Sequence, residues 1–267
     1  MSSLGKIVRI NRMKNSVSQR IFTVAMDHAP SYGILPGLQH IQSLLDIVVE
    51  NQPDAILLMK GVAETCYQPF AGKIPLLLKC SMLSPLHSQH DIVVSSVEDA
   101  LRLGADAIAM AVTFGSAYQA EILSNLALLV KEAEKVGLPV IVHAYPNGDL
   151  IPQNERYSVT QVGYASRVAM ELGVDIVKTF YTGSAETFSE VVRLASPALV
   201  VAAGGQKLDT EHDVLKMVYN VVEAGATGVT IGRNIWQNKN IAGIMRAIKK
   251  IIHEKLALDK AIEELAI

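Results

Sequence analysis

Short apolar runs alternate with longer segments of helical period from Ile21 to near the end of the chain. Apolar runs of four to eight residues between turn residues are typical of buried strands, and the longer segments repeat apolar residues as amphipathic helices do. The pattern is therefore a strand followed by a helix, repeated. Eight runs are predicted to be strands: Ile21–His28, Ala55–Lys60, Pro75–Ser81, Ala107–Val112, Pro139–Tyr145, Asp175–Tyr181, Ala198–Ala203 and Gly228–Arg233.

One junction recurs where a helical segment meets the next strand. Its four copies read LGAD, VGLP, LGVD and AGAT, with glycine at Gly104, Gly137, Gly173 and Gly225. Glycine is favoured at such a position because it adopts the left-handed conformation that ends many helices. The recurrence indicates one repeated structural unit. The helices predicted before these glycines are Ser96–Leu103, Gln119–Val136, Thr160–Leu172 and Asp213–Ala224.

Eight parallel strands alternating with helices in a chain of this length predict a single (β/α)8 TIM barrel rather than an open sheet. We expect one domain over residues 1–267, with a lead-in at 1–20 and a helical extension at 255–267. The tail from Ile241 is predicted to form a closing amphipathic helix. It is expected to pack against the barrel or against a neighbouring subunit.

The composition of the chain limits the classes of molecule that it is expected to bind. Half of the residues are hydrophobic and only 5% are aromatic, which suits a parallel sheet covered by helices. The formal net charge of -2 gives no electrostatic reason to expect a nucleic acid or an anionic membrane. The two cysteines, Cys66 and Cys80, form no CxxC motif and are expected to be reduced. No secretory or transmembrane segment is recognised, so we expect a cytoplasmic protein acting on small molecules.

Three lysines lie in or at the ends of predicted strands, where a barrel carries its chemistry. Lys60 precedes a glycine and can extend toward water, and Lys79 lies deeper, either as an anion-binding cation or as a nucleophile. Lys178, in VDIVKTFYTG, is flanked by apolar and aromatic residues. Burial and a nearby positive charge lower the pKa of an amine, and only a neutral amine attacks a carbonyl. Lys178 is therefore predicted to form an imine; a structural cation paired with a carboxylate is the alternative.

Imine chemistry also needs a group that moves protons. Tyr145 ends the preceding predicted strand, and Asp27 ends the first one. Both are predicted to take part in acid–base steps. The alternatives are a rim tyrosine bonded to the backbone and, for Asp27, a helix cap or the partner of a lysine.

Glycines follow the last two predicted strands. Gly204 and Gly205 follow the seventh, and Gly232 with Arg233 follows the eighth. Glycine lets backbone N–H groups approach an anion closely, and barrels often bind phosphate in these two loops. We predict an anion site here, although turns also need glycine for conformational reasons.

Five segments taken together resemble a known family: MDHA, AYPNG, DIVKTFYTG, AAGGQK and IGRNIWQ, in this order. They resemble the archaeal-type class I fructose-bisphosphate aldolases and their relatives, which include 2-amino-3,7-dideoxy-D-threo-hept-6-ulosonate synthase and a thiolase acting on a phosphorylated dione. The resemblance implies a homo-oligomeric lyase that acts on a phosphorylated sugar without a metal or other cofactor. It implies that Lys178 is the Schiff-base lysine, Tyr145 the general acid–base and Asp27 a residue that orients or exchanges protons, with Gly204, Gly205, Gly232 and Arg233 holding a substrate phosphate and His28 and Lys207 nearby. Lys79, a lysine that the fructose-bisphosphate enzymes also have on this strand, is predicted to bind substrate.

Some positions depart from that family. Asn147 stands where many members have an arginine that could bind a second anionic group, and His143 stands where an aromatic residue is frequent. The residues after Lys79 match neither subgroup. These departures leave the predicted bond-making residues intact and leave the substrate open.

Other functions fit the same fold. One is a transaldolase-type synthase, and another is an aldolase for a sulfonated ketose phosphate. A metal-dependent aldolase would use His28, His143 and Asp27 as ligands, but no HxH or HExxH spacing supports it. A phosphosugar isomerase would need a carboxylate base and no imine. A catalytically silent barrel acting as a binding subunit is the remaining alternative.

Overall fold

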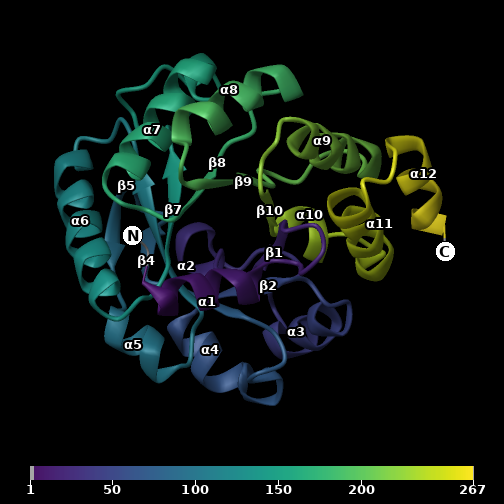
Figure 1. The fold of residues 1–267 in the computed structure, drawn as a ribbon, viewed down its shortest axis with the longest axis horizontal. Helices are drawn as coiled ribbons and strands as arrows, with labels where there is room; N and C mark the ends of the chain where they lie inside the picture. The colour runs from purple at the N-terminus through teal and green to yellow at the C-terminus, as the bar shows by residue number, and fades with distance from the viewer. Residues whose placement is uncertain (1–2, 267) are drawn as a thin grey trace.

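The computed structural model describes residues 3–266, and eight of its strands close into a parallel barrel. The hydrogen-bonded order is β1-β10-β9-β8-β7-β6-β3-β2, and helices surround the strands (Figure 1). This arrangement confirms the predicted (β/α)8 barrel. All eight predicted runs contain a barrel strand, and only Thr113, at the end of β6, extends beyond its run. The barrel strands are β1 (Ile21–Ala25), β2 (Ala55–Met59), β3 (Leu76–Lys79), β6 (Ala107–Thr113), β7 (Val140–Tyr145), β8 (Ile176–Thr179), β9 (Leu199–Ala203) and β10 (Gly228–Ile231).

The four predicted helices are α5, α6, α7 and α9, and the glycines after them have positive φ angles between 62° and 86°. The recurring junction is thus the predicted left-handed turn. The helices are α1 (Leu4–Met13), α2 (Ala29–Tyr32), α3 (Ile41–Glu50), α4 (Lys60–Cys66), α5 (Val97–Arg102), α6 (Gln119–Lys135), α7 (Val159–Glu171), α8 (Ala185–Ala195), α9 (Glu211–Glu223), α10 (Arg233–Trp236), α11 (Ile241–Glu254) and α12 (Leu258–Glu263), with short 3-10 turns at Gln68–Phe70, Gln153–Glu155 and Glu264–Ala266.

Alternation along the strands creates two apolar cores. One lies between the strands and the surrounding helices, and the other fills the inside of the barrel. The inner core includes Ile141 of β7 and Ile176 of β8, and Met13 at the end of α1 closes it from the amino-terminal side. Two residues further along, on the same face, come His143 and Lys178. The inner face therefore changes from apolar to polar toward the carboxyl-terminal end of the strands.

Helix α1 covers the amino-terminal end of the barrel and lies across the middle of the view in Figure 1. Its Lys6 lies 3.0 Å from Asp175, and Arg12 lies 3.2 Å from Asp106. Asp175 also accepts a hydrogen bond of 2.9 Å from Val140 N–H. The predicted lead-in thus contains a helix that seals this end; Met1 and Ser2 lie outside the described residues.

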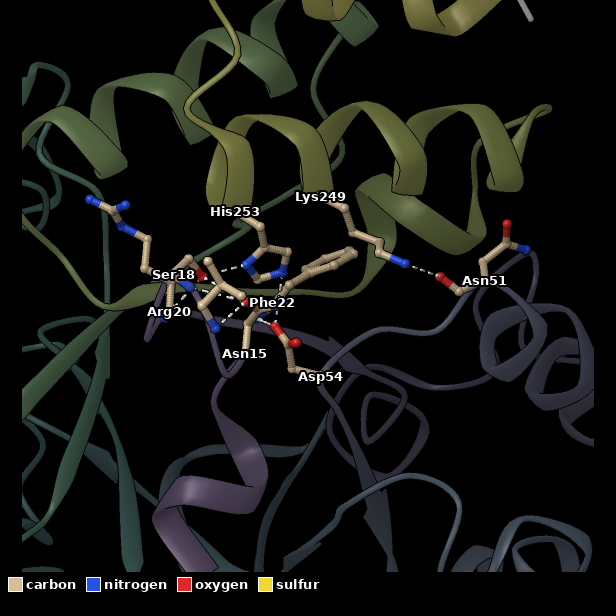
Figure 2. Close-up of polar contacts among 9 residues, drawn as sticks. Asn15, Ser18, Arg20, Phe22, Asn51, Asp54, Lys249 and His253 are labelled. Atoms are coloured by element: carbon tan, nitrogen blue, oxygen red, sulfur yellow. Dashed lines mark hydrogen bonds and ion pairs between the residues drawn. The ribbon is translucent and has the colours of Figure 1, made fainter.

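The last long helix, α11, joins the first two strands at the same end (Figure 2). His253 of α11 lies between Ser18 and Asp54, with 2.8 Å from its Nδ1 to the Ser18 hydroxyl and 3.2 Å from its Nε2 to the carboxylate. Asp54 also accepts a hydrogen bond of 2.6 Å from Phe22 N–H. The tail from Ile241 is a helix that packs on the barrel, as predicted, and Ile267 at its end lies outside the described residues.

A β-hairpin that the sequence reading did not predict follows β3. Its strands are β4 (Ser81–Ser84) and β5 (His87–Val93), and they pair antiparallel. Ser81, predicted to end the third barrel strand, begins the hairpin instead. The physical reason is that β6 continues after its last pairing with β3 at Ala109. The N–H groups of Ala111 and Thr113 then bond to Ser81 Oγ at 2.8 Å and Asp91 Oδ2 at 2.9 Å.

Within residues 3–266, no helix combines the length and the apolar character that crossing a bilayer requires.

Candidate active site

A cavity of about 780 Å³, including its opening to solvent, lies at the carboxyl-terminal end of the barrel strands. The structure brings nine of the ten predicted site residues to this cavity and leaves out Lys207, whose side chain is exposed in the loop after β9. Lys60 also lies elsewhere, at the start of α4, ion-paired with Asp99 at 2.9 Å. The predicted residues in the cavity wall are Asp27, His28, Lys79, Tyr145, Lys178, Gly204, Gly205, Gly232 and Arg233.

Lys178 is 6% exposed and faces the inside of the barrel. Burial, together with the positive charges of Lys79 and Arg233, lowers its pKa to about 8, although the negative charge of Asp27 opposes the shift. At neutral pH about a tenth of the molecules therefore carry a neutral amine at this position. An ordinary lysine would be protonated almost completely, and the neutral form is the one that can attack a carbonyl.

Lys79 is equally inaccessible but differently bonded. Its ammonium group donates hydrogen bonds of 2.8 Å to both the carbonyl and the hydroxyl oxygen of Ser81. Lys79 thus supplies the positive charge that helps to keep Lys178 neutral.

Tyr145 lies on β7 beside Lys178. Its ring stacks on Phe180 with 4.7 Å between centroids, and Phe180 contacts Tyr157 at 4.9 Å on a tilted plane. Phe180 follows Lys178 by two residues, and side chains two residues apart in extended chain lie on the same face. The Lys178 amine and the Phe180 ring that supports Tyr145 therefore lie on one face. Burial raises the pKa of Tyr145 well above its usual value. The phenol therefore holds its proton at neutral pH and can act as an acid.

Asp27 and His28 follow β1, with 3.5 Å between Asp27 Oδ1 and His28 Nδ1. Burial opposes ionisation of Asp27, but its interactions with His28, Lys178 and Lys79 outweigh burial and lower the pKa. Asp27 is therefore ionised. Burial lowers the pKa of His28 to about 4 and that of His143 well below its usual value. Both imidazoles are neutral near pH 7.

No group of three or more His, Cys, Asp or Glu side chains within residues 3–266 is arranged as metal ligands. His28, His143 and Asp27 line the same cavity without forming such a group.

The loops after β9 and β10 form one unit. The buried Asn234 side chain donates hydrogen bonds to the carbonyls of Gly204 at 2.8 Å and Gln206 at 2.9 Å, and accepts one from Leu208 N–H at 2.8 Å. A β-carbon on Gly232 would lie 2.4 Å from the His28 ring, so only glycine fits there. Gly232 thus lets the His28 ring pack against the backbone, and it lines the cavity beside Arg233.

Arg233 is the cation of this unit. Its guanidinium lies 5.4 Å from the centre of the Tyr32 ring, and its Nε is buried without a hydrogen-bond partner. A cation with an unused donor beside glycine loops is suited to an anionic group.

Four further residues in or beside the cavity were not predicted from the sequence: Asp91, Tyr32, Asn234 and Phe180, on which Tyr145 stacks. Asp91 and Tyr32 both line the cavity from segments that are not barrel strands. The hairpin had a sequence signal, since SMLS and HDIVV flank a Ser-Pro turn. Asn234 lies inside the recognised IGRNIW segment, but its contacts depend on the positions of two loops that are distant in sequence.

The family model that describes DeoC/LacD family aldolases matches residues 21–238. The class 1 fructose-bisphosphate aldolase of Thermoproteus tenax is 36% identical over 243 residues, which cover 88% of this chain and 90% of that protein. The 2-amino-3,7-dideoxy-D-threo-hept-6-ulosonate synthase of Halobacterium salinarum is 32% identical over 256 residues, covering 95% of this chain and 94% of that protein.

Among solved structures, one is similar with a TM-score of 0.85 and 30% identity, covering 93% of this chain and 99% of the other. It is an archaeal fructose-1,6-bisphosphate aldolase whose catalytic lysine is covalently bound to the carbinolamine intermediate of its substrate.

Proposed function

Because the chain belongs to the DeoC/LacD family of aldolases, we propose that it is a class I aldolase, a lyase that breaks or forms a carbon–carbon bond in a phosphorylated ketose through a lysine imine. One observation carries the proposal: Lys178 is buried in the barrel with its pKa lowered to about 8. Tyr145 and Asp27 line the same cavity.

The reaction begins with imine formation. The neutral amine of Lys178 adds to the ketone carbon, and the resulting carbinolamine loses its hydroxyl as water. Tyr145, which holds its proton at neutral pH, supplies that proton to the departing hydroxyl and becomes a phenolate. The iminium cation that remains can accept an electron pair from the neighbouring carbon–carbon bond.

Cleavage then follows. The Tyr145 phenolate, or alternatively Asp27, removes the proton from the hydroxyl on the far side of the bond. That oxygen forms the aldehyde, and the electrons of the broken bond move to the iminium and give an enamine. The enamine takes a proton on carbon, and water hydrolyses the imine and restores the Lys178 amine. Run in reverse, the same steps form the bond.

The phosphate of the substrate is proposed to lie at the unit formed by Gly204, Gly205, Gly232 and Arg233. The position of these glycines in the cavity wall and the unused Arg233 donor support this placement. His28, neutral and in contact distance of Gly232, is proposed to line the same end. Lys207, exposed in the loop after β9, is the one predicted residue whose approach to substrate would require a movement of its side chain.

Borohydride reduction tests the proposal directly. Reduction in the presence of dihydroxyacetone phosphate should attach the ketone fragment to the peptide that contains Lys178, as measured by mass spectrometry. Lys178→Ala should abolish the adduct, and Lys60→Ala, which changes a strand-end lysine outside the cavity, should leave it unchanged. An adduct on another lysine, or full activity of Lys178→Ala, would refute the assignment.

A transaldolase-type synthase is the second candidate, because the synthase of Halobacterium salinarum matches 95% of this chain. In that case the enamine would be captured by a second carbonyl compound instead of by a proton. Release of free triose phosphate from a ketose phosphate without any acceptor would favour the aldolase, and strict dependence on an acceptor would favour the synthase.

Three broader features belong to the same proposal. Residues 1–267 are proposed to act as one aldolase domain, assembled as a homo-oligomer and working in the cytoplasm on carbohydrate phosphates. Chromatography with light scattering would establish the size of the assembly.

A further inference from the structure

Asp91, on strand β5 of the hairpin, is a buried carboxylate in the cavity wall. Its side chain is 1% exposed, and its Oδ1 atom has no hydrogen-bond partner. Within residues 3–266 no lysine, arginine or histidine forms a salt bridge with it. A buried carboxylate oxygen without a partner is costly, so its retention at the edge of a substrate cavity requires an explanation.

The hydrogen bonds that Asp91 makes within the fold involve only one of its two carboxylate oxygens. Its Oδ2 accepts hydrogen bonds from the N–H of Thr113 at 2.9 Å and from the Thr113 hydroxyl at 2.6 Å. These bonds replace the strand partner that β6 lacks above the end of β3. They satisfy one oxygen and leave Oδ1 available to a ligand.

The position of Asp91 is also fixed. The carbonyl of the preceding Gln89 accepts a hydrogen bond from the Ser116 hydroxyl, and its side chain accepts one of 2.9 Å from Asp149 N–H. His90 stacks on Tyr118 with 4.3 Å between centroids. These contacts hold the chain just before Asp91, and the pairing of Ile92 with Met82 holds it just after, so the carboxylate cannot easily turn away.

The order of strands places Asp91 relative to the reaction. Going round the barrel, the proposed phosphate loops follow β10 and β9, Lys178 lies on β8, Tyr145 on β7, and Asp91 is bonded to β6. A substrate with its phosphate in those loops and its ketone at Lys178 therefore extends past Tyr145 toward Asp91. The part of the substrate that reaches Asp91 is the fragment that leaves as the aldehyde.

A second unused acceptor lies beside this path. Asn147, in the loop after β7, lines the cavity, and its Oδ1 is buried without a hydrogen-bond partner. Carboxylate oxygens accept hydrogen bonds from hydroxyl or ammonium groups, whereas a phosphate beside a buried carboxylate meets an uncompensated like charge. The chemistry of this end is therefore opposite to that of the Gly232–Arg233 end.

Resting on the proposed aldolase function, we propose that Asp91 determines specificity for the aldehyde fragment. It binds a hydroxyl group or another uncharged or cationic hydrogen-bond donor there, and it excludes a second phosphate. The preferred substrate is then a ketose that carries phosphate at one end only.

Two aldehydes that differ only in a phosphate test this inference. The rate of condensation with dihydroxyacetone phosphate would be measured for D-glyceraldehyde and for D-glyceraldehyde 3-phosphate. We expect kcat/KM of the intact protein to be at least about tenfold higher for the unphosphorylated aldehyde. Asp91→Asn, which keeps an acceptor for Thr113 N–H, should lower kcat/KM for D-glyceraldehyde about tenfold and reduce the preference by a similar factor.

Asp106→Asn is the matched control, since it makes the same change at a buried carboxylate at the opposite end of β6. It should leave the preference unchanged. Borohydride trapping of dihydroxyacetone phosphate, which lacks the aldehyde fragment, should be equal in all three proteins. No trapping in the intact protein would refute the proposed function itself. Three results, each with normal trapping, would overturn the role of Asp91 alone. They are a preference of the intact protein for the phosphorylated aldehyde, no use of either aldehyde, and an equal loss of kcat/KM for both aldehydes in Asp91→Asn.

Discussion

At the amino-terminal end of the barrel, two partly buried carboxylates are paired: Asp54 with Phe22 N–H and His253, and Asp175 with Val140 N–H and Lys6. At the carboxyl-terminal end, polar atoms remain without partners. Seven buried side-chain atoms lack a hydrogen-bond partner within residues 3–266, and four of them belong to residues of the cavity. The four are His28 Nδ1, Asp91 Oδ1, Asn147 Oδ1 and Arg233 Nε.

The difference indicates that polar groups at the amino-terminal end stabilise the fold, whereas those at the carboxyl-terminal end are available to bind a ligand. A buried polar atom with partners contributes to folding, whereas one without partners lowers stability until a ligand supplies the missing bond. The two ends should therefore respond in opposite ways to substitution. Changes at the amino-terminal end should cost stability and leave catalysis intact, and changes at the cavity should do the reverse.

The largest effect is expected for Lys178→Met. Its aldolase activity should fall at least about a thousandfold, because the substitution removes the amine that is proposed to form the imine. Its stability should rise. The pKa of Lys178 is about 8 in the folded protein against 10.5 for an ordinary lysine, so below pH 8 the unfolded chain holds its proton more tightly. Removing the amine should then stabilise the fold by about 3 kcal/mol at pH 7 and by little above pH 10.5.

Urea unfolding of the intact protein and of Lys178→Met at both pH values would measure this difference. A lower stability of the variant at pH 7 would contradict the contrast between the two ends.

Asp54→Ala makes the converse change. It removes the acceptor of Phe22 N–H and the partner of His253, so we expect a loss of about 3 kcal/mol in the free energy of unfolding. The kcat and KM of the folded fraction should stay within about twofold, because Asp54 is at the far end of the barrel from the cavity. Asn51→Ala offers a mild control, because it removes only an exposed side-chain hydrogen bond to the Ile47 carbonyl and keeps the backbone carbonyl that bonds Lys249. A large drop in kcat of well-folded Asp54→Ala would show that the ends are not independent.

The pH dependence of kcat/KM should reflect the neutral fraction of Lys178. Below pH 8 it should rise about tenfold per pH unit and then level off. Lys79→Met removes a positive neighbour and should move the rise to higher pH, whereas Asp27→Asn removes a negative neighbour and should move it to lower pH. Both shifts would be read from kcat/KM profiles between pH 5.5 and 9.5, chosen as roughly two units around the pKa. Shifts in the same direction in both variants would show that another group controls the profile.

The smallest effect concerns the support of Tyr145. Phe180→Ala removes the ring on which Tyr145 stacks, and aromatic pairs contribute about 1 kcal/mol. We expect kcat to fall several-fold, KM to change little, and Phe180→Tyr to restore most of the rate. Borohydride trapping at equilibrium should remain. An unchanged kcat would mean that the tyrosine is held by other contacts.

The sequence predicted most of the fold because the barrel repeats a local pattern. Each strand is a short apolar run, and the Gly104, Gly137, Gly173 and Gly225 turns recur in the same place. Lys178, Tyr145 and Asp27 could be predicted as neighbours, since all strand ends of a parallel barrel meet at one mouth. The placement of Lys79 and the glycine loops followed from the same rule.

What escaped prediction depends on irregular segments. Asp91 reaches the cavity because β6 extends beyond β3 and the hairpin bonds to the part of β6 that β3 does not cover. The periodic pattern of the sequence does not predict the exact lengths of these two strands. Asn234 acts through three backbone groups of another loop. Lys207, predicted from the motif AAGGQK, is exposed in the irregular loop after β9, where Gly205 has a φ of 68°.

The pairing of β1 with β10 has a consequence for the synthesis of the protein. Ile21 of β1 is paired with Gly228 of β10. His253 of α11 contacts Asp54, which precedes β2 and accepts a hydrogen bond from Phe22 N–H of β1. The cavity combines His28 from the start of the chain with Gly232 and Arg233 from near its end. A nascent chain on the ribosome therefore has no complete site until nearly all of it has emerged, and enzymatic activity should arise only when the growing polypeptide has brought its two ends together.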